Sequence, residues 1–314
     1  MLKRFAAILP CAAATASSAA GSPLVSSKES SAQAGSAAKD GLKVSVTFDA
    51  VKEFTKAVGG DRVKISTIIP DGAEPHDFEP KAQDLAELST AKVFVYSGFG
   101  MESWADKAIS SAGNPNLVTV EASKGAEPIQ NTDSGEIKEH GQYDPHIWLS
   151  LKGAETEAEN IKNGLAMADP GSRDYYEKDC DSFVYRLESL YSEYDGKFRT
   201  VSQKSFVTGH AAFGYLCRDF GLKQNSVEDV YAEGEPSAKQ LAELVQYCRD
   251  HKVTCVFAEK MASPQVFQTL ASEVGAKVET IYMMESGEDS GDYLERIESD
   301  LSRIYRSLGS GNEK

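Results

Sequence analysis

The chain has 314 residues, of which 41% are hydrophobic and 26% are charged, and its formal net charge is −15. This length and composition are typical of a globular protein large enough for two domains. The negative charge repels phosphate backbones and argues against nucleic-acid binding. Beyond the N-terminal leader, no stretch reaches the roughly 18 apolar residues that a membrane-spanning helix needs.

The N-terminal segment has the features of an export signal. Lys3 and Arg4 precede a short apolar run, and small residues then continue to Ala20. This order of charge, apolar stretch and small residues predicts a secretory signal, and the Ser-, Ala- and Gly-rich sequence that follows predicts a flexible tether. We therefore expect residues 1–41 to be a disordered signal and tether, and the mature chain to lie in the periplasm or at the cell surface. Cys11 matches a lipoprotein cleavage site poorly, so the sequence does not decide whether the mature chain carries a lipid anchor.

The chain between residues 42 and 120 alternates predicted strands and helices. Apolar alternation and β-branched runs mark the strands, and longer amphipathic stretches with glycine or proline at their ends mark the helices. In chain order, we expect strand 42–48, helix 50–58, strand 63–69, helix 80–89, strand 92–96, helix 104–111 and strand 116–120.

A polar loop at 122–143 separates this half from a second one. There we expect helices at 152–168 and 173–198, strand 205–208, helix 212–220, strand 225–230, helix 237–251, strand 253–258, helix 264–274, strand 277–282 and helix 292–308. Alternating strands and helices predict parallel sheets covered by helices. The predicted fold is α/β, with two lobes, each holding a parallel β-sheet flanked by helices, joined by one long rigid helix. The predicted domains are an N-terminal lobe at 42–169, the connecting helix at 170–200 and a C-terminal lobe at 201–314.

Three of the five histidines lie in well-defined contexts. They are His76 within GAEPHDFEP (72–80), His146 within DPHIWL (144–149), and His210 within TGHAAFGYL (208–216). Proline before His76 and His146 fixes the backbone that presents each ring, and His210 follows a predicted strand. Imidazole is the commonest metal-binding side chain, and parallel sheets place ligand sites at the carboxyl ends of their strands. Three histidines brought together by the fold suit zinc or a neighbouring divalent ion.

The order and context of these motifs resemble the zinc- and manganese-specific solute-binding proteins of bacterial ABC transporters, from about residue 42 to residue 308. The segments GGDRV (59–63) and VFVYSG (93–98) support the resemblance. It implies an extracytoplasmic receptor that holds Zn²⁺ between two lobes and delivers it to an ABC permease, without enzymatic activity, and we expect a monomer. By this resemblance, His76 and His146 are metal ligands. The third ligand is His210, which favours zinc over Mn²⁺ or Fe²⁺.

The fourth ligand follows less directly from the motifs. The family places an acidic residue after the last strand, where Glu285 is the nearest match, although the local pattern departs from the family's. Glu288, Asp289, Glu259 or water are the alternatives. Because Glu259 ends a predicted strand, we favour a role for it in holding an imidazole by its other N–H.

A zinc hydrolase and a surface adhesin are the alternatives to a transport receptor. A zinc hydrolase could use three histidines, a water and Glu259 as general base, but the chain lacks the His-Glu-x-x-His and Gly-x-Ser-x-Gly motifs. A surface adhesin is the third hypothesis, and no repeat in the sequence supports it. Cys248 and Cys255 could form a disulfide in an exported protein or could be two buried thiols.

Overall fold

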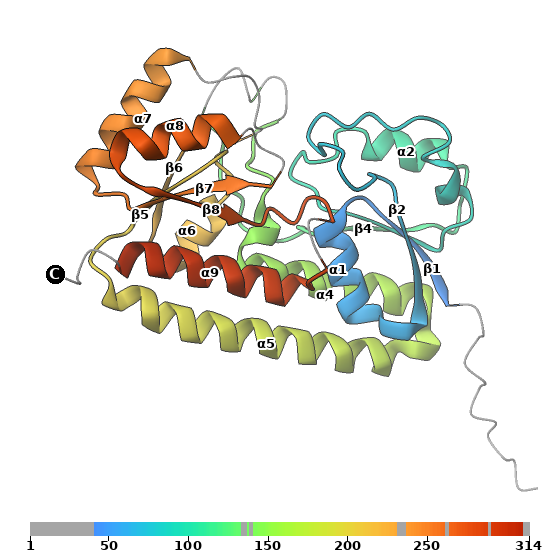
Figure 1. Cartoon of the computed structure of the whole chain (residues 1–314). Coiled ribbons are helices and arrows are strands. Elements are labelled where there is room, and N and C mark those ends of the chain that lie inside the picture. Colours follow the sequence, from blue (N-terminus) through green and yellow to red (C-terminus); the bar gives the residue numbers. More distant parts are fainter. Residues whose placement is uncertain are drawn as a thin grey trace, which may run out of the picture. The chain divides into compact units, whose positions relative to one another are not determined.

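The computed structural model describes residues 41–132, 137, 141–230, 237–260, 264–287 and 290–309. Within them, two four-stranded parallel sheets form the centres of two lobes (Figure 1). The first sheet has the order β2-β1-β3-β4 and the second has the order β6-β5-β7-β8. Both lobes belong to one compact unit. The predicted α/β class with two parallel sheets is therefore confirmed.

The N-terminal lobe is a three-layer arrangement. Val93 and Val95 of β3 pack toward α1 and α4, whereas Phe94 between them packs toward α2. This alternation follows from the two-residue period of a strand and buries both faces of the sheet. The elements of the lobe are β1 (Leu42–Val46), α1 (Asp49–Gly59), β2 (Val63–Thr67), β3 (Val93–Tyr96), α2 (Ala105–Ser111), β4 (Val118–Glu121) and α4 (Leu151–Ala168).

The C-terminal lobe is layered in the same way. Val207 and Val256 face α7 and α8, whereas Phe206 and Phe257 face the core that α5, α6 and α9 share. The elements are β5 (Ser205–Thr208), α6 (Gly214–Phe220), β6 (Lys223–Ser226), α7 (Ala238–Asp250), β7 (Cys255–Glu259), α8 (Pro264–Val274), β8 (Lys277–Ile281) and α9 (Tyr293–Gly309).

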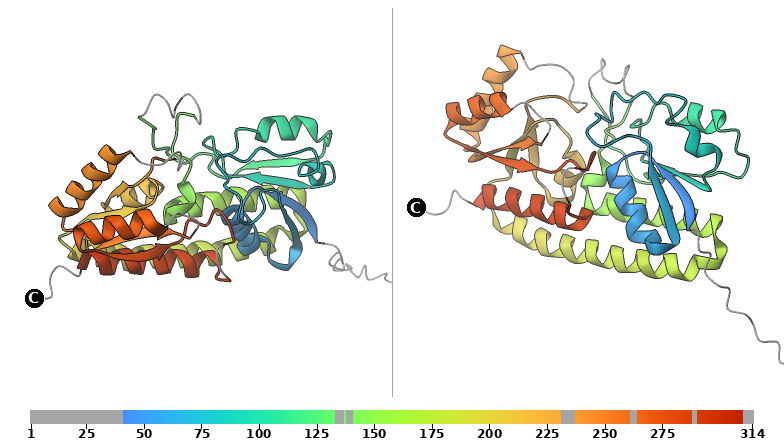
Figure 2. Two further views of the ribbon diagram at one scale, coloured as in Figure 1. Left: turned by 45° about the horizontal axis from the view of Figure 1, so that its top comes forward. Right: turned by 45° about the vertical axis from the view of Figure 1, so that its right-hand side comes forward.

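The long helix α5 (Arg173–Thr200) runs beneath both lobes in Figure 1 and in the right-hand view of Figure 2. Its 28 residues carry a buried stripe that includes Tyr176, Phe183 and Phe198. This stripe joins side chains of both lobes in one continuous core. At 1.5 Å per residue the helix spans roughly 42 Å, long enough to support both sheets. The predicted long connecting helix is thus confirmed, and it ties the lobes together through shared packing.

Two predicted elements differ from the structure. The helix expected at 80–89 is wrong, because only a 3₁₀ turn forms at Ala86–Ser89. The backbone N–H groups of Ala86 and Leu88 bond the carbonyls of Gln83 and Leu85, three residues back instead of four, so the chain winds as 3₁₀ and not as an α-helix. The strand expected at 225–230 forms earlier, at Lys223–Ser226, because Gly221 closes α6 in a left-handed conformation and the chain extends directly afterwards.

The described residues contain four cysteines, none of which forms a disulfide. Cys180, Cys217, Cys248 and Cys255 are all free and buried, so Cys248 and Cys255 follow the second of the two alternatives drawn from the sequence. Among the described helices, none combines the length and apolar character needed to cross a bilayer.

Candidate metal site

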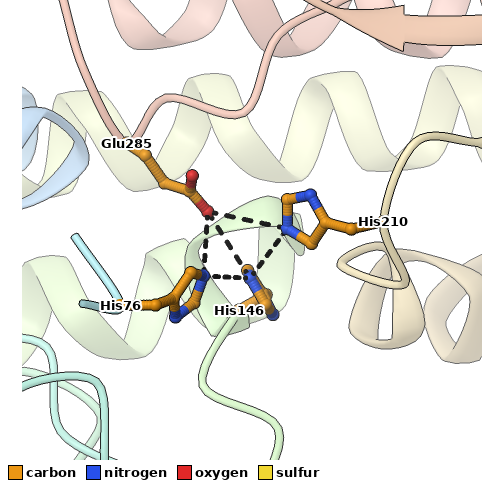
Figure 3. Close-up of side chains that lie close together, drawn as sticks. All are labelled: His76, His146, His210 and Glu285. Atoms are coloured by element: carbon orange, nitrogen blue, oxygen red, sulfur yellow. Dashed lines mark hydrogen bonds and ion pairs between the residues drawn. The ribbon is translucent and has the colours of Figure 1, made fainter. Parts of the chain in front are cut away.

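Four side chains from distant parts of the chain converge between the lobes. One ligand atom from each of His76, His146, His210 and Glu285 lies within 4.8 Å of all the others (Figure 3). His76 comes from the loop after β2, His146 precedes the short turn that leads into α4, His210 follows β5, and Glu285 follows β8. His76, His210 and Glu285 thus lie in the segments after the carboxyl ends of β2, β5 and β8, where parallel α/β sheets place their ligand sites.

The distances within this cluster fit a small divalent cation. The Nε2 atom of His146 lies 3.2 Å from that of His76 and 3.3 Å from that of His210. Oε1 of Glu285 lies 3.6, 3.4 and 3.9 Å from the Nε2 atoms of His76, His146 and His210. Tetrahedral zinc with bonds near 2.0–2.1 Å holds its ligand atoms roughly 3.3 Å apart. The donor atoms are therefore already close to the separations that a tetrahedral ion needs.

Glu285 gives independent support for a cation. Its Oε1 atom is buried and has no hydrogen-bond partner among the described residues. A buried carboxylate oxygen without a hydrogen bond is costly, and a bound cation would offset that cost more directly than imidazole nitrogens 3.4–3.9 Å away. The neighbouring imidazoles already favour the charged form: although burial opposes ionisation, His146 and His76 hold the pKa of Glu285 well below its usual range. The donor set therefore has the chemistry of a metal site.

The environment of His146 fixes which ring nitrogen faces the centre. Oδ1 of Asp144 lies 2.9 Å from Nδ1 of His146 and also accepts the His146 backbone N–H at 2.9 Å. A neutral ring that donates through Nδ1 presents the lone pair of Nε2 to the cluster. The backbone carbonyl of Asp144 in turn accepts the hydroxyl of Tyr215 at 2.7 Å. The fully buried His146 is thus oriented from two sides.

Asp144 was not singled out by the sequence reasoning. The available signal was its position two residues before the histidine, with Pro145 between them. Aspartate in that position often bonds the backbone two residues later.

The pKa values of His146 and His210 are shifted in opposite directions. Burial opposes a charged ring at His146, but the bond to Asp144 and the carboxylate of Glu285 outweigh it and raise the pKa of His146 to about 9. At His210, burial dominates over the attraction of Glu285, and with repulsion from the other two rings it lowers the pKa to about 3. A metal would therefore meet a neutral ring at His210 and would displace a proton from His146.

Glu259 lies beside His210 in a supporting position. Its Oε1 accepts the backbone N–H of His210 at 3.1 Å and lies 3.8 Å from Nδ1 of the ring. The expectation that Glu259 holds the imidazole by its second N–H is therefore replaced by a bond to the backbone. The carbonyl of His210 also accepts bonds from the Thr208 hydroxyl and the Gln224 amide, both at 2.8 Å. The alternative residues Glu288 and Asp289 lie outside the described residues.

A two-lobed α/β fold with a buried donor cluster between the lobes is the architecture of a solute-binding protein. The sequence pattern of the family described as zinc-uptake complex component A, periplasmic (ZnuA), matches residues 44–307 of this chain. The chain therefore belongs to that family.

Individual relatives agree with this assignment. A protein of Treponema pallidum (strain Nichols) that is named for metal binding is 45% identical over 276 residues, covering 85% of this chain and 87% of that protein. The high-affinity zinc uptake system protein ZnuA of Bacillus subtilis (strain 168) is 36% identical over 285 residues, covering 86% and 88%. The structure of laminin-binding protein (Lmb) of Streptococcus agalactiae, described as bifunctional with adhesin and metal-transporting activity, is similar with a TM-score of 0.77 and 34% identity, covering 86% of this chain and all of that one.

Proposed function

We propose that this chain is an extracytoplasmic receptor that binds Zn²⁺ through His76, His146, His210 and Glu285 and delivers it to an ABC permease. The observation that carries the proposal is the convergence of three Nε2 atoms and one carboxylate oxygen that accepts no hydrogen bond in a buried cluster. Membership of a zinc-uptake family supports zinc as the cargo and a permease as the partner. Members of this family are transport receptors, so we do not assign an enzymatic activity.

The donor set supports zinc over Mn²⁺ or Fe²⁺. Three imidazole nitrogens and one carboxylate oxygen suit a tetrahedral zinc ion, whereas manganese prefers more oxygen ligands and higher coordination. A hydrolase would need an open coordination position for water. Four protein ligands fill the tetrahedron and leave no such position, which supports binding over catalysis.

The remaining features of the proposal concern location and assembly. We propose that residues 1–41 act as the export signal and tether, with or without a lipid on the mature chain, and that the exported receptor works as a monomer. We also propose that residues 42–169 form the N-terminal lobe, residues 170–200 the connecting helix and residues 201–314 the C-terminal lobe. The description of the family as periplasmic supports a location outside the cytoplasmic membrane.

Metal analysis of the full chain tests the proposed function. Protein purified without chelator should carry one zinc per chain, and the metal-free protein should bind Zn²⁺ far more tightly than Mn²⁺ in competition against a chromogenic chelator. His146→Ala should weaken zinc binding by orders of magnitude. His251→Ala is the matched control, because His251 is exposed at the end of α7, and its ring centroid lies 4.2 Å from that of Tyr247, outside the metal cluster. Zinc binding that survives His146→Ala unchanged would refute the ligand assignment.

Adhesion is a second candidate, favoured by the similarity to the Lmb structure. A plate assay of the purified chain on immobilised laminin would test it. Saturable binding would support an adhesive role beside transport, and equal binding to albumin would exclude it.

A further inference from the structure

Two segments meet beside the metal site from opposite ends of the chain. One is residues 70–80, the His76 loop, which follows β2. The other is residues 283–287, the Glu285 strap, which connects β8 with α9. Figure 3 shows His76 and Glu285 approaching the cluster from these two segments. The contacts between the loop and the strap determine whether Nε2 of His76 and Oε1 of Glu285 face each other.

A reciprocal pair of hydrogen bonds joins the loop to the strap. The backbone N–H of Gly72 donates to Oγ of Ser286 at 2.6 Å. The backbone N–H of Gly287 donates to Oδ1 of Asp71 at 3.1 Å. Each segment therefore offers one side chain and one backbone N–H to the other, across 214 and 216 positions of sequence. We name this pair of bonds the latch.

The strap itself is firmly attached to the N-terminal lobe. The carbonyl of Met284 accepts the backbone N–H of Ala50 at 2.8 Å, and the carbonyl of Met283 accepts Nε1 of Trp148 at 2.8 Å. Met284 has a φ of 59°, a conformation that a side chain other than glycine adopts only when its surroundings impose it. The strap is thus a rigid support for Glu285 and for its half of the latch.

The His76 loop is more exposed than the Glu285 strap. Its residues Asp71, Gly72, Glu74, Asp77 and Glu79 are exposed. The donor side chains beneath it are all buried: the His76 side chain is 1% exposed, and His146, His210 and Glu285 are 0%, 5% and 8% exposed. The loop is therefore the side of the metal site that faces solvent.

We propose that Asp71 and Ser286 are positioning residues, and that the latch they form sets the rate at which the site takes up and releases its metal. When the latch is closed, the His76 ring lies against the rigid Glu285 strap and completes the cluster. When it opens, His76 withdraws with its exposed loop and leaves three donors behind. This inference rests on the proposed function, since it takes Zn²⁺ as the metal held by the cluster.

Zinc dissociation after rapid mixing with excess chelator tests the latch directly. Loss of one such hydrogen bond changes an equilibrium by about fivefold, so Asp71→Ala and Ser286→Ala should each raise the dissociation rate constant by about that factor. The double variant should exceed either single variant. Asp106→Ala is the charge-matched control, because Asp106 is an exposed residue of α2 in the same lobe, and its rate should equal that of the parent.

Two further variants separate the latch from simpler explanations. Asp71→Asn removes the charge but keeps an oxygen that can accept the N–H of Gly287, so it should retain the slow dissociation of the parent. Gly287→Ala does not mutate Asp71 or Ser286, but its added Cβ would lie 2.8 Å from Oδ2 of Asp71. That side-chain end can swing away, so the variant should fold and release zinc faster.

The outcomes separate the latch from the proposed function. If the parent binds no zinc, the proposed function fails and the latch fails with it. If the parent binds one zinc but Asp71→Ala, Ser286→Ala and Gly287→Ala release it at the parent rate, the latch alone is refuted. A fall in the melting temperature of the metal-free variants with unchanged zinc release would mean a structural role and would equally refute it. An Asp71→Asn variant as fast as Asp71→Ala would show that charge, not the hydrogen bond, controls release.

Discussion

The carboxylate of Asp144 contacts His146 twice, at Nδ1 of the ring and at the backbone N–H, both at 2.9 Å. The two contacts fix the ring orientation and its tautomer together. His146 is also the donor that lies closest to the other three, with its Nε2 between 3.2 and 3.4 Å from each of them. Asp144 therefore controls the geometry at the centre of the cluster without contacting the metal position.

Replacement of Asp144 should weaken zinc binding while leaving its stoichiometry unchanged. Carboxylates that orient a ligating histidine typically contribute 10- to 100-fold to metal affinity. We expect Asp144→Asn, which cannot favour the required tautomer as strongly, to lose affinity in that range by chelator competition. Asp106→Ala, a surface carboxylate change in the same lobe, should leave affinity unchanged. Equal affinities for Asp144→Asn and the parent would show that the ring is oriented by other contacts.

Zinc binding should release protons near neutral pH. The pKa of His146 is raised from 6.5 to about 9, so in the metal-free protein this ring is charged at pH 7.5, and zinc requires it neutral. His210, with a pKa lowered to about 3, is already neutral and contributes no proton. Affinity should therefore rise with pH up to about 9. Titration calorimetry in buffers of different ionisation enthalpy measures the protons released, and a value of zero at pH 7.5 would contradict the assignment.

The stability of the metal-free protein should change over the same pH range. A histidine whose folded pKa lies above its unfolded value stabilises the fold below the unfolded pKa, and that contribution is lost as pH rises through the folded pKa. For His146 the range runs from 6.5 to about 9. We expect the melting temperature of metal-free protein to fall from pH 6.5 to 9.5, and the His146→Ala variant to show a smaller fall. An equal fall in both proteins would assign the effect to other groups.

The sequence contained enough to predict the fold class and three of the four clustered side chains. His76, His146 and His210 were found because proline or a strand end fixed each local backbone, and local backbone rules can be read from a single segment. Their role as ligands stays a prediction that the zinc titrations test. Glu285 could only be given with alternatives, because its loop has no comparable local constraint.

Other features could not be predicted because they depend on packing between distant segments. The bond from Gly287 to Asp71 joins residues 216 positions apart, and no periodicity records such a contact. The helix expected at 80–89 is replaced by a 3₁₀ turn, in which Leu88 bonds the carbonyl three residues back and not four, and the amphipathic pattern does not distinguish the two.

A buried ion pair joins α1 and α9 and should be costly to break. Nη1 of Arg296 lies 2.6 Å from Oδ2 of Asp49, and both side chains are 3% exposed. Breaking a buried pair by removing one partner typically costs about 3–5 kcal/mol, and Asp49 would keep only its ion pair with the partly exposed Lys52, 2.9 Å away. We expect Arg296→Met to lower the free energy of unfolding by about that amount in urea titrations.

An exposed ion pair provides the contrast. Arg199 is 78% exposed where it pairs with Asp195 in α5, so Arg199→Ala should change stability by less than about 1 kcal/mol. Similar costs for Arg296→Met and Arg199→Ala would mean that the buried pair is compensated elsewhere.

Gly209, the residue before His210, should not tolerate even a methyl group. A Cβ at this position would overlap with Oε2 of Glu259, whose other oxygen accepts the His210 backbone N–H. Gly209→Ala must therefore displace Glu259 or the His210 backbone, and we expect a loss of zinc affinity of at least about tenfold, as for other residues that orient a ligand. Gly196→Ala is the matched control, because a Cβ there meets nothing within 4 Å in α5, and it should stabilise the protein by about 0.5–1 kcal/mol. Chelator competition and urea unfolding of both variants measure the two effects. Parent-like zinc affinity in Gly209→Ala would show that His210 is not held in place by the carboxylate of Glu259.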